Sequence, residues 1–80
     1  MKPPTEKQLE VLGFIHDFID TYRYPPTCDE IGKHFGFSLA SAQDHIRFLI
    51  IKACVTREYY KARTIRITDR GFDAMMAVSV

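Results

Sequence analysis

The chain has 80 residues and a mass of 9.3 kDa, with 11 Lys and Arg residues against 10 Asp and Glu residues for a formal net charge of +1. A chain of this length forms one small domain, so we expect a single domain over residues 1–80 and no deep substrate pocket. The 46% hydrophobic and 26% charged content is that of an ordinary globular domain and excludes a disordered or fibrous protein.

The charge is unevenly distributed along the chain. Residues 1–40 carry four basic and six acidic groups, a net charge of −2, whereas residues 41–80 carry seven basic and four acidic groups, a net charge of +3. Five of the basic groups lie within Arg57–Arg70. Such asymmetry indicates where an anionic partner would bind.

The cysteines and the apolar runs predict the cellular setting. Cys28 and Cys54 lie 26 residues apart and form no zinc-ligand pattern with the three histidines. We therefore expect free thiols in a reducing cytoplasm, and neither a metal nor a cofactor. The uncharged apolar runs, such as Phe48–Ile51, are all too short to span a membrane, and the N-terminus lacks the apolar core of a signal peptide. The sequence thus predicts a cytoplasmic protein.

A first helix is predicted to begin near Glu6. Thr5 followed three residues later by Gln8 is a capping box, and apolar residues recur at spacings of three and four along residues 9–22. Tyr24-Pro25-Pro26 ends this helix, because proline lacks the backbone donor that a helix needs. We expect these three residues to form a short extended piece at a sheet edge.

Two further helices follow closely. A second capping box, Thr27 with Glu30, predicts a short helix over Cys28–Phe35. Gly36 can adopt the left-handed conformation of the residue that closes this helix, and Ser38 can cap a third helix at about residues 39–52. The apolar spacing gives the third helix this buried stripe: Ala42, His45 or Ile46, Leu49 and Ala53.

The remainder of the chain predicts a hairpin and a last helix. Val55–Tyr59 and Thr64–Thr68 are rich in β-branched and aromatic residues and are expected to form two strands. Tyr60–Arg63 between them makes a basic and aromatic tip. A turn over Thr68–Gly71 leads into a helix over Phe72–Val78, which carries three large apolar residues on one side: Phe72, Met75 and Met76.

This order of elements predicts a winged helix-turn-helix. Gly32 and Ala42 allow the second and third helices to cross closely, and the turn between them contains Gly36. We therefore expect a mainly α fold with a small β-hairpin, comprising a three-helix core, a β wing and a short C-terminal helix. In this class the third helix enters the major groove of DNA, and the wing, at about residues 57–66, lies over phosphates.

One segment is especially distinctive: Pro25-Pro26-Thr27 followed by Glu30-Ile31. It is accompanied by Thr5, Gln8, Val11, Leu12, Ile15, Gly36, Phe37, His45, Ile46 and Leu49. In these residues the chain resembles the N-terminal DNA-binding domain of LexA-type repressors, from about Thr5 to Ile67. The stretch Arg63–Gly71 also looks like the wing exit of MarR-like regulators. The resemblance implies a winged helix that binds operator DNA, usually as a homodimer, and represses transcription in a bacterial cytoplasm.

The chain also departs from the LexA-type pattern. Ala53 stands where glycine is common, and Ala40 stands where some members carry a base-reading asparagine. The operator sequence therefore does not transfer. The self-cleaving Ser/Lys domain of those repressors has no counterpart before the chain ends at Val80, so we expect no autoproteolysis unless the chain is a fragment.

For the third helix, the resemblance places the base and backbone contacts on four polar residues: Ser38, Ser41, Gln43 and Asp44. Gln43 can pair with adenine and Asp44 can accept from cytosine, so we assign base reading to these two. Arg47 can reach a phosphate, and together with Ser38 and Ser41 it positions the helix. Ala40 completes the contact face at the asparagine position.

For the wing, Lys61 and Arg63 are expected to contact phosphate or to enter a minor groove. Arg57 and Arg66 flank this tip and complete the predicted DNA-binding set. Tyr59 and Tyr60 should face opposite sides, so that one lies in the core and the other packs against a sugar-phosphate stretch.

Several of these residues have a structural alternative. Asp44 can instead be a carboxylate at a helix N-terminus, since Ser41-x-x-Asp44 is itself a capping pattern. Gln43 can be solvated surface, and the charges of the hairpin can be solvated as well. His45 is expected to be a half-buried core histidine rather than a ligand.

Two functions remain open. The leading hypothesis is a sequence-specific double-stranded DNA-binding transcriptional regulator, most simply a repressor. The alternative is a winged-helix protein-interaction module, such as a phage- or plasmid-type antagonist of another regulator, which the modest charge and the apolar residues 72–80 favour. No catalytic arrangement occurs at useful spacing, so an enzyme is not expected. The last helix is a possible homodimer contact.

Overall fold

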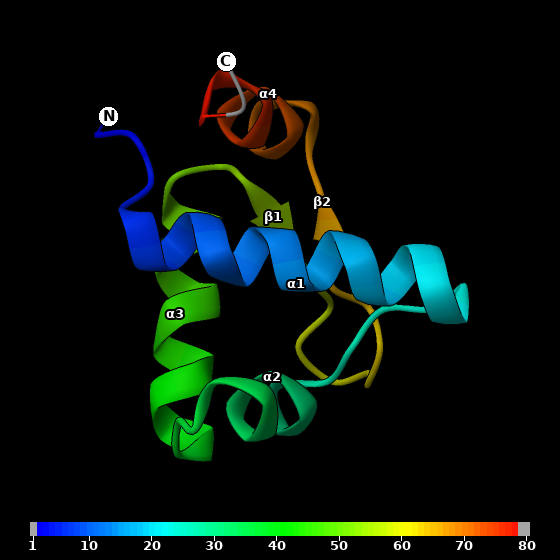
Figure 1. Cartoon of the computed structure of the whole chain (residues 1–80). Helices are drawn as coiled ribbons and strands as arrows, with labels where there is room; N and C mark the ends of the chain where they lie inside the picture. The colour runs from blue at the N-terminus through cyan, green and yellow to red at the C-terminus, as the bar shows by residue number, and fades with distance from the viewer. Residues whose placement is uncertain (1, 79–80) are drawn as a thin grey trace.

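The computed structural model describes the backbone of residues 2–78 and the side chains of residues 2–77. Four helices flank one two-stranded antiparallel sheet, and α1 crosses the molecule with α2 and α3 on one side and α4 on the other (Figure 1). The elements follow one another in the order α1 (Glu6–Tyr22), α2 (Cys28–Phe35), α3 (Leu39–Ile51), β1 (Val55–Thr56), β2 (Arg66–Ile67) and α4 (Asp69–Val78). This is the predicted order, and the fold class is confirmed.

The first helix begins and ends for local reasons. The Thr5 hydroxyl accepts from the Gln8 amide at 3.2 Å, and the Gln8 side chain accepts from the Thr5 amide at 2.9 Å, which confirms the capping box. Arg23 closes α1 in the left-handed region, with φ of 67°. The expectation of a sheet edge at Tyr24–Pro26 is wrong, because in the described residues the sheet consists of β1 and β2, and Pro25 and Pro26 are instead fully buried.

The second and third helices match their predicted caps. Thr27 and Glu30 form a capping box at α2, and the Ser38 hydroxyl accepts from the Ser41 amide at 3.1 Å at the start of α3. The buried stripe of α3 includes Ala42, Ile46 and Leu49 as expected, but it does not include Ala53. Because α3 ends at Ile51, Ala53 takes a φ of 60° and turns outward, and Cys54 takes the inward position.

The hairpin is shorter than predicted. Val55 pairs with Ile67 and Thr56 with Arg66, and the chain between them forms a long loop over residues 57–65, which together with β1 and β2 we call the wing. Beyond Thr56 the Glu58 amide donates to the Thr64 hydroxyl at 2.9 Å, so a side-chain acceptor replaces the next backbone pairing.

The last helix begins three residues earlier than predicted. The Thr68 hydroxyl accepts from the Gly71 amide at 3.1 Å, so the segment expected to be a turn is the cap and first turn of α4. The three apolar residues do not share one environment: Met75 packs against the core, whereas Phe72 is 42% and Met76 69% exposed.

The core lies where α1, α2, α3 and the wing meet. Among the side chains that the structure describes, eleven buried hydrophobic residues form it: Val11, Leu12, Ile15, Cys28, Ile31, Ala42, Ile46, Leu49, Cys54, Val55 and Ile65. The helices α1, α2 and α3 each contribute fully buried side chains to this cluster. The core therefore fixes α3 against α2 and holds the base of the wing beside both.

Candidate nucleic-acid interface

The turn between α2 and α3 depends on two glycines. Gly36 closes α2 with a φ of 76°, a left-handed conformation that favours glycine. A Cβ atom on Gly32 would lie 2.9 Å from the Phe37 carbonyl oxygen and 3.7 Å from the Ala42 Cβ, so this position has room only for glycine. The chain thus returns tightly against α2 before α3 begins, which places α3 across α2 as a helix-turn-helix requires.

The predicted contact residues of α3 lie together on its outer side. Ser38, Ala40, Gln43, Asp44 and Arg47 are exposed, while Ser41 is half-buried. The opposite side of the helix carries the buried Ala42, Ile46 and Leu49. This face therefore presents hydroxyl, amide, carboxylate and guanidinium groups to solvent along residues 38–47, the groups that can contact base edges in a major groove.

Asp44 and Arg47 are linked on this face. An Arg47 Nη2 atom lies 2.9 Å from an Asp44 carboxylate oxygen, and both side chains are more than half exposed. The capping interpretation of Asp44 is wrong, because Ser38 caps α3 and Asp44 is the sixth helical residue, beyond the first turn. Its carboxylate is available to a base only if Arg47 turns elsewhere.

Three exposed apolar residues of α3 were not predicted. Leu39 is 50%, Phe48 46% and Ile51 63% exposed. Phe48 and Ile51 follow Asp44 at spacings of four and seven, so they continue the same outer face, and this periodicity was readable in the sequence. Leu39 is exposed because it is the first residue of α3.

The wing brings the tyrosines beside α3 rather than into the core. Tyr59 is 67% exposed and Tyr60 is fully exposed, so the expectation that one of them is buried is wrong. The chain leaves the ladder after Thr56, and the alternation on which that expectation depended ends there. Gln43, Asp44, Arg47, Ile50, Arg57 and Tyr59 line a groove of about 310 Å³ between α3 and the wing.

Two wing cations point outward. Lys61 lies at the tip, its side chain 75% exposed, with Nζ 3.8 Å from a Glu58 carboxylate oxygen. Arg66 is exposed on β2 opposite Thr56 and makes no ion pair with any residue in the described part of the chain. Both cations are therefore placed to meet an anion outside the protein.

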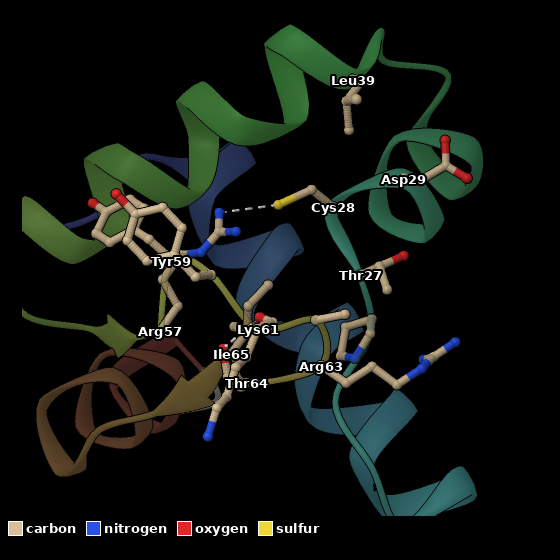
Figure 2. A pocket seen from close by; sticks show the side chains of 13 residues that line it. Thr27, Cys28, Asp29, Leu39, Arg57, Tyr59, Lys61, Arg63, Thr64 and Ile65 are labelled. Atoms are coloured by element: carbon tan, nitrogen blue, oxygen red, sulfur yellow. Dashed lines mark hydrogen bonds between the residues drawn. The ribbon is translucent and has the colours of Figure 1, made fainter.

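The other two wing cations turn toward the start of α2. Arg57 donates from Nη1 to the Cys28 sulfur at 3.4 Å, drawn as a dashed line in Figure 2, and its guanidinium also lies over the Tyr59 ring. Arg63 extends toward the segment that leads into Thr27 and contacts Pro25 and Glu30. Between the wing and this segment lies a hollow of about 370 Å³.

Two groups of the domain, Glu30 and Cys54, have shifted pKa values. The Thr27 backbone amide donates to the Glu30 carboxylate and, with the Arg63 guanidinium, holds the pKa of Glu30 below its ordinary value. Burial raises the pKa of the Cys54 thiol.

Cys28 and Cys54 are both free and buried, as expected. His45 is half-buried against the Phe37 ring, with ring centroids 4.4 Å apart.

The described part of the chain contains neither a candidate metal cluster nor a candidate membrane-spanning helix. Among the described residues, no group of three or more His, Cys, Asp or Glu side chains could hold a metal ion. No helix within residues 2–78 is long and apolar enough to cross a membrane.

A helix-turn-helix followed by a hairpin beside its second helix defines the winged helix-turn-helix class. The fold is similar to two solved structures from Staphylococcus aureus, each 20% identical in sequence. One is MepR, a transcription regulator of the multidrug efflux pump MepA, with a TM-score of 0.75 over 95% of this chain and 54% of that one. The other is a MepR-DNA complex, with a TM-score of 0.76 over 94% of this chain and 54% of that one.

Within this class, residues 1–64 match the family model of the LexA DNA binding domain, and the chain belongs to that family. The LexA repressor of Sorangium cellulosum is 43% identical over 70 residues, which are 86% of this chain and 30% of the repressor. The LexA repressor of Limosilactobacillus fermentum is 39% identical over 72 residues, 89% of this chain and 35% of the repressor. The chain thus spans about a third of the length of these relatives.

Proposed function

We propose that this chain binds double-stranded DNA at specific sequences and represses transcription from the sites that it occupies. The observation that carries the proposal is the exposed polar face of α3 beside a basic wing, in a member of the LexA DNA binding domain family. An α-helix fits the major groove, and a wing reaches the adjacent backbone. The relatives named above are repressors, and one solved structure with this fold is a complex with DNA.

In this proposal α3 reads the bases. Gln43 can donate to and accept from adenine, and Asp44 can accept from cytosine N4 once Arg47 moves to a phosphate. Ser38 and Ser41 hold the helix N-terminus on the backbone, where amide groups favour phosphate oxygens. Ala40 offers only a methyl group, which suits contact with a thymine methyl.

In this proposal the outward cations of the wing neutralise DNA phosphates. Lys61 at the tip and Arg66 on β2 are both exposed, and we assign the phosphate contacts to them. Arg57 and Arg63, which belong to the predicted set, hold internal partners and would contribute to the surface potential around the groove.

Selection of bound duplexes from a random library tests this function. We expect an enriched sequence whose affinity falls linearly with the logarithm of salt concentration, by about 0.9 in slope for each neutralised phosphate. Lys61→Ala should reduce that slope by about 0.9, the contribution of one phosphate. Gln43→Ala should change the selected sequence and weaken the binding free energy for the original sequence by about 1–3 kcal/mol. No duplex retention, or retention without sequence preference, would contradict the proposal and favour a protein-interaction module.

The proposal extends to a homodimer in the bacterial cytoplasm. Repressors of this class commonly read two half-sites one helical turn apart, and pairing doubles the contacts of a domain with little net charge. Phe72 and Met76 are the exposed apolar residues of α4, which lies across α1 from α2 and α3 (Figure 1). A contact through α4 would therefore leave the α3 face uncovered.

A further inference from the structure

Arg63 has an unusually complete set of contacts for a wing residue. Its Nη1 atom donates to Glu30 Oε1 at 2.8 Å and to the Pro25 carbonyl at 3.2 Å, and its Nη2 atom lies 3.3 Å from Glu30 Oε2. The guanidinium carbon also lies 4.5 Å from the centre of the Tyr24 ring. One side chain thus meets a carboxylate in fork geometry, a carbonyl and an aromatic face.

The acceptors all come from one segment of the chain. Residues 24–30, Tyr-Pro-Pro-Thr-Cys-Asp-Glu, supply the aromatic face, the carbonyl oxygen and the carboxylate in that order. The segment is rigid, because Pro25 and Pro26 are fully buried and Glu30 is also held by the Thr27 amide at 2.9 Å. A rigid acceptor site makes a defined docking point for a loop.

The wing reaches this docking point by a specific backbone path. Arg63 takes a φ of 58°, an unfavourable conformation for a residue with a side chain, which its contacts with the segment must offset. Arg57, at the other end of the loop, contacts Cys28 of the same segment. The two ends of the wing loop are therefore both fastened to residues 24–30, with Lys61 between them.

We propose that Arg63 is a positioning residue that docks the wing onto residues 24–30, and that it does not contact phosphate. Docking sets the distance between Lys61 and the outer face of α3, so the wing is held ready for the backbone beside the groove. The effect of docking on phosphate contact rests on the proposed DNA binding, whereas the docking itself is a property of the free protein. It gives the Pro-Pro-Thr-x-x-Glu segment a role beyond starting α2.

The first test uses the free protein. Glu30→Gln keeps a capping-box residue at the start of α2 but removes the charge that Arg63 contacts. Asp29→Asn is the matched control, because Asp29 lies at the same helix end and its ion pair, with Lys33, does not involve the wing. Under native conditions we expect trypsin to cut after Lys61 about threefold to tenfold faster in Glu30→Gln than in Asp29→Asn.

Cleavage after Arg47 of α3, whose partner Asp44 is untouched by either variant, reports unfolding of the helical core in the same digest and so corrects for any loss of global stability. The expected increase is in the ratio of cleavage after Lys61 to cleavage after Arg47. An unchanged ratio would overturn the docking proposal, whatever the protein binds.

The second test measures affinity for the selected duplex at several salt concentrations. A docked wing predicts that Glu30→Gln weakens binding by about threefold to tenfold without changing the salt slope, and that Arg63→Ala has little further effect in that background. A phosphate-binding Arg63 predicts the reverse: Glu30→Gln would free the guanidinium and bind at least as tightly as Asp29→Asn, and Arg63→Ala would lower the slope by about 0.9. If no duplex is bound at all, the function fails while the proteolysis result still decides the docking.

Discussion

At the scale of single residues, the backbone concentrates its unfavourable conformations at chain reversals. Arg23, Ala53 and Arg63 have φ values of 67°, 60° and 58°, each at the end of a helix or of the wing loop. A left-handed conformation costs a residue with a side chain roughly 1–2 kcal/mol relative to glycine. Arg63 has tertiary contacts that offset this cost, whereas Ala53 is exposed and has only a methyl group.

We therefore expect Ala53→Gly to stabilise the protein by about 1 kcal/mol, which for a domain of this size raises the melting temperature by roughly 4–8 °C. Urea unfolding measures the change in the free energy of unfolding. The matched variant is Gly36→Ala, at a φ of 76°, which should destabilise by a similar amount. Destabilisation by Ala53→Gly would contradict the described end of α3.

Gly71 is constrained by space rather than by φ. A Cβ atom here would collide with the Cys54 carbonyl oxygen and would lie 2.8 Å from Ile67 Cγ2, so α4 could not approach β2 as closely. We expect Gly71→Ala to destabilise the domain by about 1–3 kcal/mol in urea unfolding. Gly13→Ala in α1 is the control: nothing lies within 4 Å of its added Cβ, and it should be neutral or stabilising by up to about 1 kcal/mol.

At the scale of elements, α2 is the point where helix capping and wing position meet. The Glu30 carboxylate accepts from the Thr27 amide and from Arg63, so one group both starts α2 and fastens the wing. The capping box was predictable because its two residues lie three apart in the chain. The ion pair was not, because Glu30 and Arg63 are separated by 33 residues.

The lowered pKa of Glu30 makes part of the stability dependent on pH. Since the folded protein favours the ionised carboxylate, this contribution is complete above the ordinary value of 4.5 and is lost as the pH falls through the lower folded-state pKa. We expect the difference in unfolding free energy between the wild type and Glu30→Gln to be largest near neutral pH and to shrink below pH 4.5. Urea titrations from pH 7 to pH 3 measure it, and a difference independent of pH would contradict the described contacts.

At the scale of the whole molecule, the predicted DNA-contact face and the exposed apolar residues of α4 are different surfaces. The outer face of α3 carries Arg47 and the wing tip carries Lys61, whereas α4 carries the exposed Phe72 and Met76. Figure 1 places α4 and α2 on opposite sides of α1. A partner bound to α4 would therefore leave Arg47 and Lys61 accessible.

If the chain pairs through α4, Met76→Glu should weaken self-association at least tenfold, because it would bury an unpaired carboxylate in an apolar contact. Sedimentation equilibrium of the DNA-free protein measures the effect. Ile51→Glu on α3, at a comparable exposure, is the control and should leave association unchanged. Equal association of both variants would exclude α4. Truncation after Gly71 is a poorer test, since it also removes Met75 from the core.

The sequence by itself determined the features that depend on neighbours a few residues apart. The caps at Thr5, Thr27 and Ser38, the left-handed Gly36 and most of the buried stripe of α3 follow from local hydrogen bonds and helical periodicity. These local rules were sufficient to define the element order and hence the winged helix-turn-helix.

Only the tertiary structure decided what the wing cations do. Arg57, Lys61, Arg63 and Arg66 look alike in the sequence, yet two turn inward and two outward. The inward pair is selected by Cys28 and Glu30, which lie 29 and 33 residues earlier in the chain and come within reach only when the core packs α2 beside the wing. The charge pattern of the sequence therefore cannot separate the inward arginines from the outward cations. Their partners are distant in the sequence and come close only in the folded domain.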